Sequence, residues 1–329
     1  MKAGVVGASG FMGGELVRLI DAHPRMELAM VCGGESAGKK LRDVRPGFAT
    51  DLVVQTTDAT TLAENCDVVF LALPHGQSAP LAEELLKREK LVVDLGSDFR
   101  LKDPADVEKY YSREAPRQKL LEIAWYGQPE LAGPPPANTR LIACPGCFAT
   151  ALCLGLAPIG DQQTANVFGA TGSSGSGIQA QMGVHHSLRT TGFTAYKPLK
   201  HQHLGEVDQL LRSRGSHLKY NFVPHSAPMV RGIHLTIIAE TSADQTLKTA
   251  QDLYKNANLV NVKSGPVNMG SVIGTCRVEI GIDGNETTSV ITVAIDNLLK
   301  GGSGQAIQNF NLLMGWPETE GLPLHALYP

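Results

Sequence analysis

The sequence predicts an α/β protein with an amino-terminal doubly wound parallel sheet, followed by an α+β domain with a mostly antiparallel sheet. Three observations lead to this prediction. Short apolar runs alternate with helical patterns in the first half, as expected of parallel strands buried on both faces. From about residue 165 the apolar runs are longer and helical patterns fewer, which is typical of antiparallel pairing. With 329 residues, the chain is long enough for two domains of ordinary size.

The first half contains apolar runs separated by amphipathic segments. The helical spacing over residues 11–23 places Leu16, Leu19 and Ile20 on one face. A second helix is predicted for the segment SAPLAEELLKRE. The predicted strands of this half are residues 2–6, 26–32, 67–74, 91–96 and 140–143.

In the second half, the segments NVFGAT, GIHLTIIAE, CRVEIGID and TSVITVAIDN predict strands, and residues 242–257 and 304–316 predict helices. The change of pattern places a domain boundary near residue 145. We therefore expect a nucleotide-binding domain over 1–145 and a catalytic and dimerisation domain over 146–301. Residues 302–329 are expected to pack back onto the first domain.

Composition and charge exclude several classes of protein. A net charge of −3 gives no basic footprint for nucleic acid. No run reaches the roughly 18 apolar residues that a membrane span requires. The first 20 residues lack the pattern of a secretory signal, because glycines, Glu15 and Arg18 interrupt the apolar run. These features predict a cytoplasmic protein without membrane partners, in which six cysteines do not form a disulfide framework.

A glycine cluster, VVGASGFMGGE, follows the first predicted strand and opens the first predicted helix. Glycines let the backbone approach a dinucleotide pyrophosphate, and the helix start offers free N–H groups and a positive dipole. The spacing is G-x-x-G-x-x-G rather than G-x-G-x-x-G, so a plain strand-to-helix turn is the alternative. This stretch contains the cofactor-binding candidates Gly7, Ser9, Gly10, Phe11, Met12 and Gly13.

The second predicted strand ends in CGGESAGKKLR, which bears on the choice of dinucleotide. Sites that prefer NAD place an acidic residue on the ribose hydroxyls, and Glu35 lies near that position. Ser36 and the cations Lys39, Lys40 and Arg42 could instead meet a 2′-phosphate. We predict NADP(H), with Ser36 as a contact and a solvated loop as the alternative for the lysines.

The segment RLIACPGCFATALCLGLAP contains two cysteines separated by Pro145 and Gly146. Two such thiols are compatible with half a zinc site, a redox pair or a single nucleophile. No second CxxC completes a zinc site, and the motif comes too late in the chain for a thioredoxin-like pair. A strand that ends at Ala143, a Pro-Gly bend and a helix that opens at Cys147 favour the third interpretation. A thiolate at a helix start is favoured by the dipole, and the N–H groups there can hold an oxyanion. No metal is expected.

The segment IACPGCFATALCLGLAP (142–158) resembles the active-site signature of the N-acetyl-γ-glutamyl-phosphate reductases, relatives of the aspartate-semialdehyde dehydrogenases. The resemblance extends over nearly the whole chain. It includes the amino-terminal glycine motif, LALPHG, VVDLGSDFRL, WYGQPEL, PMVRGI and the closing IDNLLKGGSGQAIQNFNLLMGWPETEGL. The resemblance implies a Rossmann-type domain, a homodimer or homotetramer, and NADPH-dependent reduction of a small acyl phosphate in arginine biosynthesis.

Two segments depart from the family pattern. The usual H-R-H-x-P-E is HQHLGE here, with Gln202 for arginine and Gly205 for proline, and a serine-rich GATGSSGSG replaces a run of small residues. A sister branch reduces carrier-linked L-2-aminoadipyl 6-phosphate in lysine biosynthesis. YKPLKHQH has some likeness to that branch, whereas Pro145 before Gly-Cys favours the arginine branch.

The resemblance also implies a mechanism. The Cys147 thiolate attacks the acyl carbon, phosphate leaves, and the thioester is reduced to N-acetyl-L-glutamate 5-semialdehyde. His201 and His203 are the acid/base candidates; on a strand, residues two apart would face opposite ways and only one could reach the thiol. The candidates for contact with the anionic substrate are Arg100, Lys197, Glu206 and Arg231, and those for contact with the cofactor in this half are Gly172 and Asn297. The alternatives are a structural ion pair for Arg100, Lys197 and Arg231 and a satisfied polar core residue for either histidine. For the loop that contains Gly172 the alternative is a flexible crossing, and for Asn297 it is a buried, turn-forming asparagine.

Overall fold

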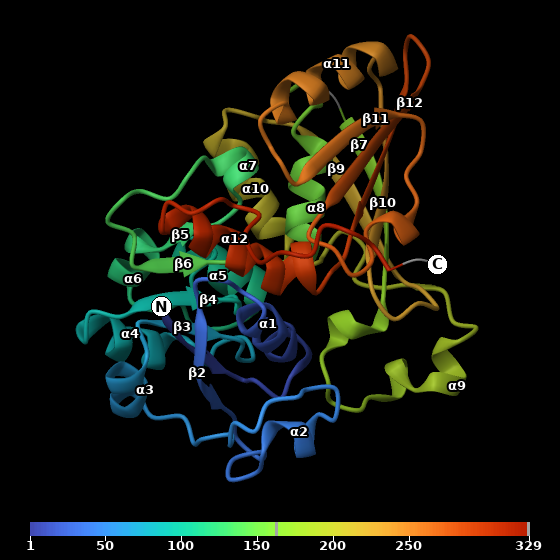
Figure 1. Cartoon of the computed structure of the whole chain (residues 1–329). Helices are drawn as coiled ribbons and strands as arrows, with labels where there is room; N and C mark the ends of the chain where they lie inside the picture. Colours follow the sequence, from blue (N-terminus) through green and yellow to red (C-terminus); the bar gives the residue numbers. More distant parts are fainter. Residues whose placement is uncertain (162–163, 328–329) are drawn as a thin grey trace. The chain divides into compact units, whose positions relative to one another are not determined.

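The structure is a computed structural model that describes residues 1–161 and 164–327 (Figure 1). Its chain divides into two compact units. The first unit contains Met1–Pro145 and Gly302–Leu322. The second contains Gly146–Gly301 and the segment that begins at Pro323.

The first unit is built on a six-stranded parallel sheet with the order β2-β1-β3-β4-β6-β5. This sheet confirms the predicted parallel α/β class. The two-residue edge strand β5 has no signature in the sequence. The strands are β1 (Lys2–Val6), β2 (Glu27–Cys32), β3 (Val68–Leu71), β4 (Leu91–Asp94), β5 (Trp125–Tyr126) and β6 (Leu141–Ala143).

Helix α1 of the first unit buries one apolar face, whereas α12 is buried nearly all round. In α1 the buried residues include Leu16, Leu19 and Ile20, as their spacing predicts. α12 contacts α1 and β4, and in Figure 1 this red helix lies among the blue and cyan elements of the first unit. The helices are α1 (Phe11–Asp21), α2 (Leu41–Val44), α3 (Ala59–Asn65), α4 (Ala79–Lys87), α5 (Pro104–Tyr111), α6 (Gln118–Ile123), α7 (Pro129–Ala132) and α12 (Gly304–Leu313).

The second unit contains a seven-stranded mixed sheet with the order β11-β12-β13-β10-β7-β9-β8. Its neighbours are antiparallel except for the parallel pairs β11/β12 and β7/β9, which confirms the predicted, mostly antiparallel sheet. The strands are β7 (Thr164–Thr171), β8 (Thr194–Ala195), β9 (Lys219–Ser226), β10 (Ile233–Ala239), β11 (Val260–Ser264), β12 (Val278–Gly284) and β13 (Ser289–Ile295).

Two helices of the second unit, α8 and α11, pack on this sheet, and α10 packs on α8. α8 is apolar nearly all round and lies against β10 and β13. Gly155 allows this close approach, because a Cβ there would lie 2.5 Å from the Cδ1 atom of Ile237. The helices are α8 (Cys147–Leu156), α9 (His186–Arg189), α10 (Leu204–Ser213) and α11 (Ala243–Tyr254), and a π-helical turn, η4 (Leu299–Ser303), precedes α12.

Within the described part of the chain, no helix has the length and apolar character needed to cross a membrane.

Candidate active site

Cys147 is the first residue of α8 and follows the N-cap residue Gly146, as the sequence predicts. It is partly exposed, whereas the other five cysteines of the chain are buried. The N-cap residue Gly146 has no side chain that could cap the helix, and the positive end of the helix dipole lies at the thiol. Gly301 packs closely against Cys147, because a Cβ at residue 301 would lie 2.8 Å from the Cys147 Cβ. Accessible and placed at a helix start, Cys147 has the surroundings of a reactive thiol.

Cys144 has the opposite surroundings. It lies just beyond β6 in the first unit, is 1% exposed and forms no disulfide. Burial raises the pKa of its thiol to about 12. At neutral pH the Cys144 thiol therefore stays protonated and is a poor nucleophile. The two cysteines of CPGC thus differ in exposure, and the buried Cys144 is the one whose thiol stays protonated. Among the described residues, no group of three His, Cys, Asp or Glu side chains could hold a metal ion.

Gly146 brings two other candidate residues next to the cysteine. A Cβ at Gly146 would lie 2.4 Å from the Nε2 atom of His203, so only glycine admits the imidazole at this position. The backbone N–H of Gly146 donates a 2.9 Å hydrogen bond to the carboxylate of Glu206, which is fully buried. Cys147, His203 and Glu206 therefore meet around the Pro-Gly bend.

His201 lies behind His203. The two histidines do not lie on a strand, so the opposite-face argument does not apply: they lie in the turn before α10, and His203 is its N-cap residue. The two rings are 4.7 Å apart, and the Nδ1 atom of His201 accepts a 3.2 Å hydrogen bond from the His203 N–H. Phe148 and Phe222 pack edge-on against His201. This ring therefore supports His203, whereas the His203 ring is the one beside the Pro-Gly bend.

We expect His201 to make the stability of the protein depend on pH. Burial, and secondarily the charge of Lys197, lowers the pKa of His201 from 6.5 to about 4. Between these values the unfolded chain binds a proton that the folded chain does not, so stability rises with pH over this window. In urea titrations, the free energy of unfolding should fall by about 3 kcal/mol more in wild type than in His201→Gln from pH 7 to pH 4. Equal losses in the two proteins would contradict a buried neutral imidazole.

The segment before the histidines is a strained turn. Lys197 and Leu199 have φ angles of 42° and 59°, in the left-handed region that few side chains other than glycine adopt. The exposed Lys197 ammonium donates a 3.0 Å hydrogen bond to Gln202, the residue that replaces the family's arginine. In this chain, Gln202 therefore accepts a hydrogen bond from Lys197.

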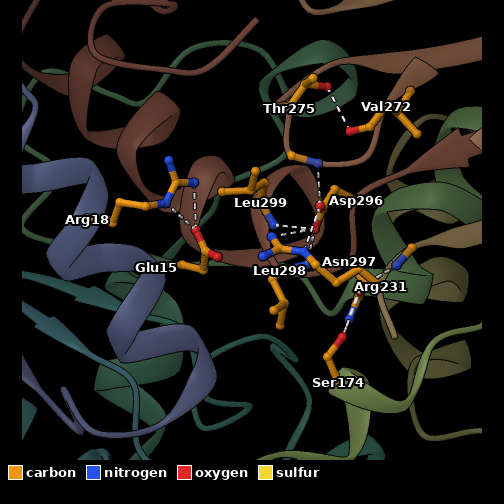
Figure 2. A network of polar contacts seen from close by, with 12 residues as sticks. Glu15, Arg18, Ser174, Arg231, Val272, Thr275, Asp296, Asn297, Leu298 and Leu299 are labelled. Carbon is orange, nitrogen blue, oxygen red and sulfur yellow. Dashed lines mark hydrogen bonds and ion pairs between the residues drawn. The ribbon is translucent and has the colours of Figure 1, made fainter. Parts of the chain in front are cut away.

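A network at the end of β13 is centred on the buried carboxylate of Asp296 (Figure 2). Arg231 forms a bidentate ion pair with it, at 2.9 and 3.0 Å. The backbone N–H groups of Gly274, Leu298 and Leu299 also donate to this carboxylate. Arg231 is thus engaged in the ion pair that was the alternative to substrate binding, and Asp296 fixes the turn that leads to Asn297.

Asn297 joins two loops of the same unit. Its Oδ1 atom accepts a 2.6 Å hydrogen bond from the Gly232 N–H, and its Nδ2 atom donates to the Ser174 hydroxyl at 3.0 Å (Figure 2). Gly172 lies at the start of the serine-rich loop, where a Cβ would lie 2.4 Å from the carbonyl oxygen of Val230. The structure therefore places the cofactor candidates Gly172 and Asn297 in one buried junction.

In the first unit, the glycine cluster forms a tight turn between β1 and α1. Gly7 has a φ angle of +84°, and a Cβ there would lie 2.3 Å from the carbonyl oxygen of Ala72. A Cβ at Gly13 would lie 2.0 Å from the Gly7 carbonyl oxygen, so the helix packs directly on the turn. These are the two tasks that glycines perform in dinucleotide-binding turns. The remaining candidates Ser9, Gly10, Phe11 and Met12 belong to the same turn and the first residues of α1.

Ser36 lies beside this turn, and its hydroxyl donates to the Ser9 hydroxyl at 3.3 Å. Two of the three cations predicted near a 2′-phosphate, Lys40 and Arg42, form ion pairs with the exposed Asp51. Arg45 reaches the turn instead, where its Nε atom donates a 2.8 Å hydrogen bond to the Ser9 carbonyl oxygen.

Arg100 is 4% exposed and lies near the carboxyl ends of β4 and β6 in the first unit. Its Nε atom donates to the Cys144 carbonyl oxygen and its Nη2 atom to the Leu95 carbonyl oxygen, both at 2.8 Å. The guanidinium thereby links the segment after β4 to the segment after β6.

Sequence reasoning missed three polar residues of these regions: Arg45, Arg189 and Tyr196. Tyr196 contacts the edge of His201, with ring centroids 6.0 Å apart. Burial, and next the nearby charge of Cys147, raises the pKa of its hydroxyl. Each belongs to a loop or a very short helix without periodicity, so no local signal marked it.

Comparison with known families gives two matches. Residues 2–138 match the model described as the semialdehyde dehydrogenase, NAD binding domain, and residues 147–297 match the semialdehyde dehydrogenase, dimerisation domain. The fold and the site thus define an oxidoreductase of the semialdehyde dehydrogenase class. The N-acetyl-γ-glutamyl-phosphate reductase of Desulforamulus reducens is 37% identical over 346 residues and covers all of both chains. The chain belongs to the N-acetyl-γ-glutamyl-phosphate reductase family.

Two further matches define the breadth of this similarity. A putative phosphate reductase of LysW-linked L-2-aminoadipate and L-glutamate from Cenarchaeum symbiosum is 37% identical over 350 residues, covering all of both chains. The structure of aspartate semialdehyde dehydrogenase with NADP from Candida albicans matches with a TM-score of 0.64 at 17% identity. That match covers 95% of this chain and 98% of the other, and it shows the shared fold.

Proposed function

We propose that the chain catalyses the NADPH-dependent reductive dephosphorylation of N-acetyl-L-glutamyl 5-phosphate to N-acetyl-L-glutamate 5-semialdehyde, in arginine biosynthesis. The observation that carries this proposal is the accessible Cys147 at the start of α8, beside the imidazole of His203. The reductases that resemble this chain over its full length support the choice of substrate.

In the proposed first half-reaction, Cys147 is the nucleophile and His203 takes its proton. The sulfur bonds to the acyl carbon, the carbon–oxygen bond to phosphate breaks, and inorganic phosphate leaves with the bonding electron pair. A thioester on Cys147 results. The backbone N–H groups at the start of α8 face the developing negative charge on the acyl oxygen.

The second half-reaction needs a hydride at the thioester carbon, which NADPH would supply when held at the glycine turn of Gly7 and Gly13. Hydride addition leaves an alkoxide on that carbon, which takes the proton that His203 holds from the first half-reaction, giving a hemithioacetal, and then returns this proton to His203. The carbon–sulfur bond then breaks, the semialdehyde forms, and the Cys147 thiolate is regenerated. Glu206 acts as a positioning residue in both halves, because it holds the Gly146 N–H and thereby the bend that presents the thiol.

The residues of the first unit fit a dinucleotide phosphate group. Gly7 packs on the Ala72 carbonyl and Gly13 packs on the Gly7 carbonyl, and a side chain at either position would block this tight turn. Ser9 and Ser36 add hydroxyls at the same turn, and Arg45 adds a cation that could meet a 2′-phosphate. Phe11, Met12, Gly172 and Asn297 complete the proposed contacts.

We also propose that the chain forms a homo-oligomer. Phe168 on β7 and Ile238 on β10 are 47% and 39% exposed on adjacent strands of the second unit's sheet. The family model matched by this unit is described as a dimerisation domain. Sedimentation of the purified chain would test this proposal, with a monomer as the contrary result.

The proposed activity is tested by a spectrophotometric assay of NADPH consumption with two acyl phosphates, each made in the assay by its own kinase. One is free N-acetyl-L-glutamyl phosphate, and the other is the carrier-linked L-2-aminoadipyl phosphate. We expect turnover of the free substrate, with NADPH preferred over NADH. Turnover of the carrier-linked substrate alone would reject the arginine branch and establish the lysine branch.

A further inference from the structure

Arg189, the last residue of α9, is a partly buried cation that the proposed mechanism does not use. It donates hydrogen bonds to the Ser226 hydroxyl and, at 3.0 Å, to the carbonyl oxygen of Thr171. Thr171 and Ser226 form the final register pair of the parallel strands β7 and β9. Arg189 therefore lies at the carboxyl end of this strand pair.

The charge of Arg189 is not neutralised by the described part of the chain. None of the carboxylates there forms an ion pair with it, and its buried Nε atom has no hydrogen-bond partner. Burial lowers the pKa of this guanidinium, which shows that its surroundings disfavour the charge. A desolvated cation without a counter-ion is costly, and its planar array of N–H donors matches the geometry of an oxyanion.

Tyr196 connects Arg189 to the nucleophile region. The Tyr196 N–H donates to the Pro224 carbonyl oxygen, two residues before Ser226, directly after the β8–β9 pairing. After burial, the charges of Cys147 and Arg189 both act on its phenol, in opposite directions. Its ring also contacts His201, whose ring lies 4.7 Å from that of His203.

We propose that Arg189 binds an oxyanion of the substrate, either the phosphoryl group or the carboxylate, and so orients the acyl carbon toward Cys147. This inference rests on the proposed function, because the acyl phosphate of that reaction carries both kinds of oxyanion. Arg189 offers a guanidinium that can pair with a substrate oxyanion, whereas the guanidinium of Arg231 is already paired with Asp296. Arg189 lies on the same unit as Cys147, as does the exposed Lys197.

The test measures the reverse reaction, in which N-acetylglutamate semialdehyde, inorganic phosphate and NADP⁺ are varied in turn. Arg189→Gln should raise one KM by about tenfold or more and leave the KM for NADP⁺ unchanged. A raised KM for phosphate would identify the phosphoryl group, and a raised KM for the semialdehyde would identify the carboxylate. Arg189→Lys, which keeps the charge but not the planar donor array, should recover part of the loss. Arg214→Gln, at an exposed residue after α10, is the matched control.

A second measurement does not depend on turnover. Inorganic phosphate and N-acetyl-L-glutamate are tested separately for protection of Cys147 against iodoacetamide, with mass spectrometry to locate the modified thiol. At least one should protect wild type and Arg214→Gln but not Arg189→Gln, whose folding is checked by thermal melting. Equal protection in all three proteins, or protection in none, would overturn the proposal for Arg189. A wild-type protein that is protected but does not turn over would instead reject only the proposed function.

Discussion

Replacing Cys147 with serine should lower turnover by roughly 10⁴-fold or more, because a serine hydroxyl beside His203 is a far weaker nucleophile than a thiolate at a helix start. The replacement is nearly isosteric, so the fold should survive. NADPH binding, measured by fluorescence titration, should be nearly unchanged, since the glycine turn of the first unit does not contain this residue. Steady-state rates of NADPH consumption measure the loss.

Cys144→Ser is the matched control for this variant. Cys144 is buried and its pKa is raised to about 12, so we expect its loss to lower stability modestly and to leave most of the turnover. Comparable losses of turnover in both variants would favour the redox-pair or metal interpretation of CPGC and contradict a single nucleophile.

Replacing Gly146 with alanine should lower kcat by about 10²-fold, because the new Cβ would displace the imidazole from its position beside the bend. The clash is with His203, whose Nε2, Cδ2 and Cε1 atoms would lie 2.4, 2.6 and 2.6 Å from that Cβ. Alanine accommodates the backbone angles of Gly146, φ −69° and ψ 148°, so the variant introduces no local backbone strain. The pH–rate profile should change with kcat, because the displaced imidazole no longer exchanges a proton with the thiol.

Gly160→Ala provides the comparison, since among the described residues no atom beyond its chain neighbours lies within 4 Å of the Cβ that it would add. We expect the activity and the pH profile of this variant to match wild type. If Gly146→Ala behaved like Gly160→Ala, the imidazole of His203 would have no part in the reaction at this position.

Sequence patterns predicted the elements whose signal is local. The strands β1, β3 and β4 are continuous apolar runs, and α1 has a 3.6-residue periodicity, because whole faces of these elements are buried. Each of these patterns lies within its own segment, so the sequence shows it directly. The glycine turn is equally local, because the positive φ of Gly7 and the close packing at Gly13 restrict the residue type directly. The two-residue strands β5 and β8 are too short for any periodicity and form only because longer strands are available to pair with them.

The positions of the two histidines could not be predicted from the local sequence. His201 and His203 are equivalent candidates in HQHLGE, and a strand would have placed them on opposite faces. The structure places them in a turn with their rings in contact, because Phe148 and Phe222 enclose His201 while Gly146 makes room for His203. The contacts of Phe148 and Gly146 with these histidines join segments more than 50 residues apart, so their outcome depends on packing that no short window of sequence contains.

By itself, then, the sequence determined the class of fold, the turn built for a dinucleotide phosphate and the different surroundings of the two thiols in CPGC. Those features depend on neighbours along the chain: a strand, a Pro-Gly bend and a helix in succession. The tertiary structure decided which histidine lies beside the bend, that Glu206 holds it, and that Arg189 is a cation without a counter-ion among the described residues. Distant segments determine burial and pairing, and these in turn determine which polar groups are satisfied within the fold and which remain available for a ligand.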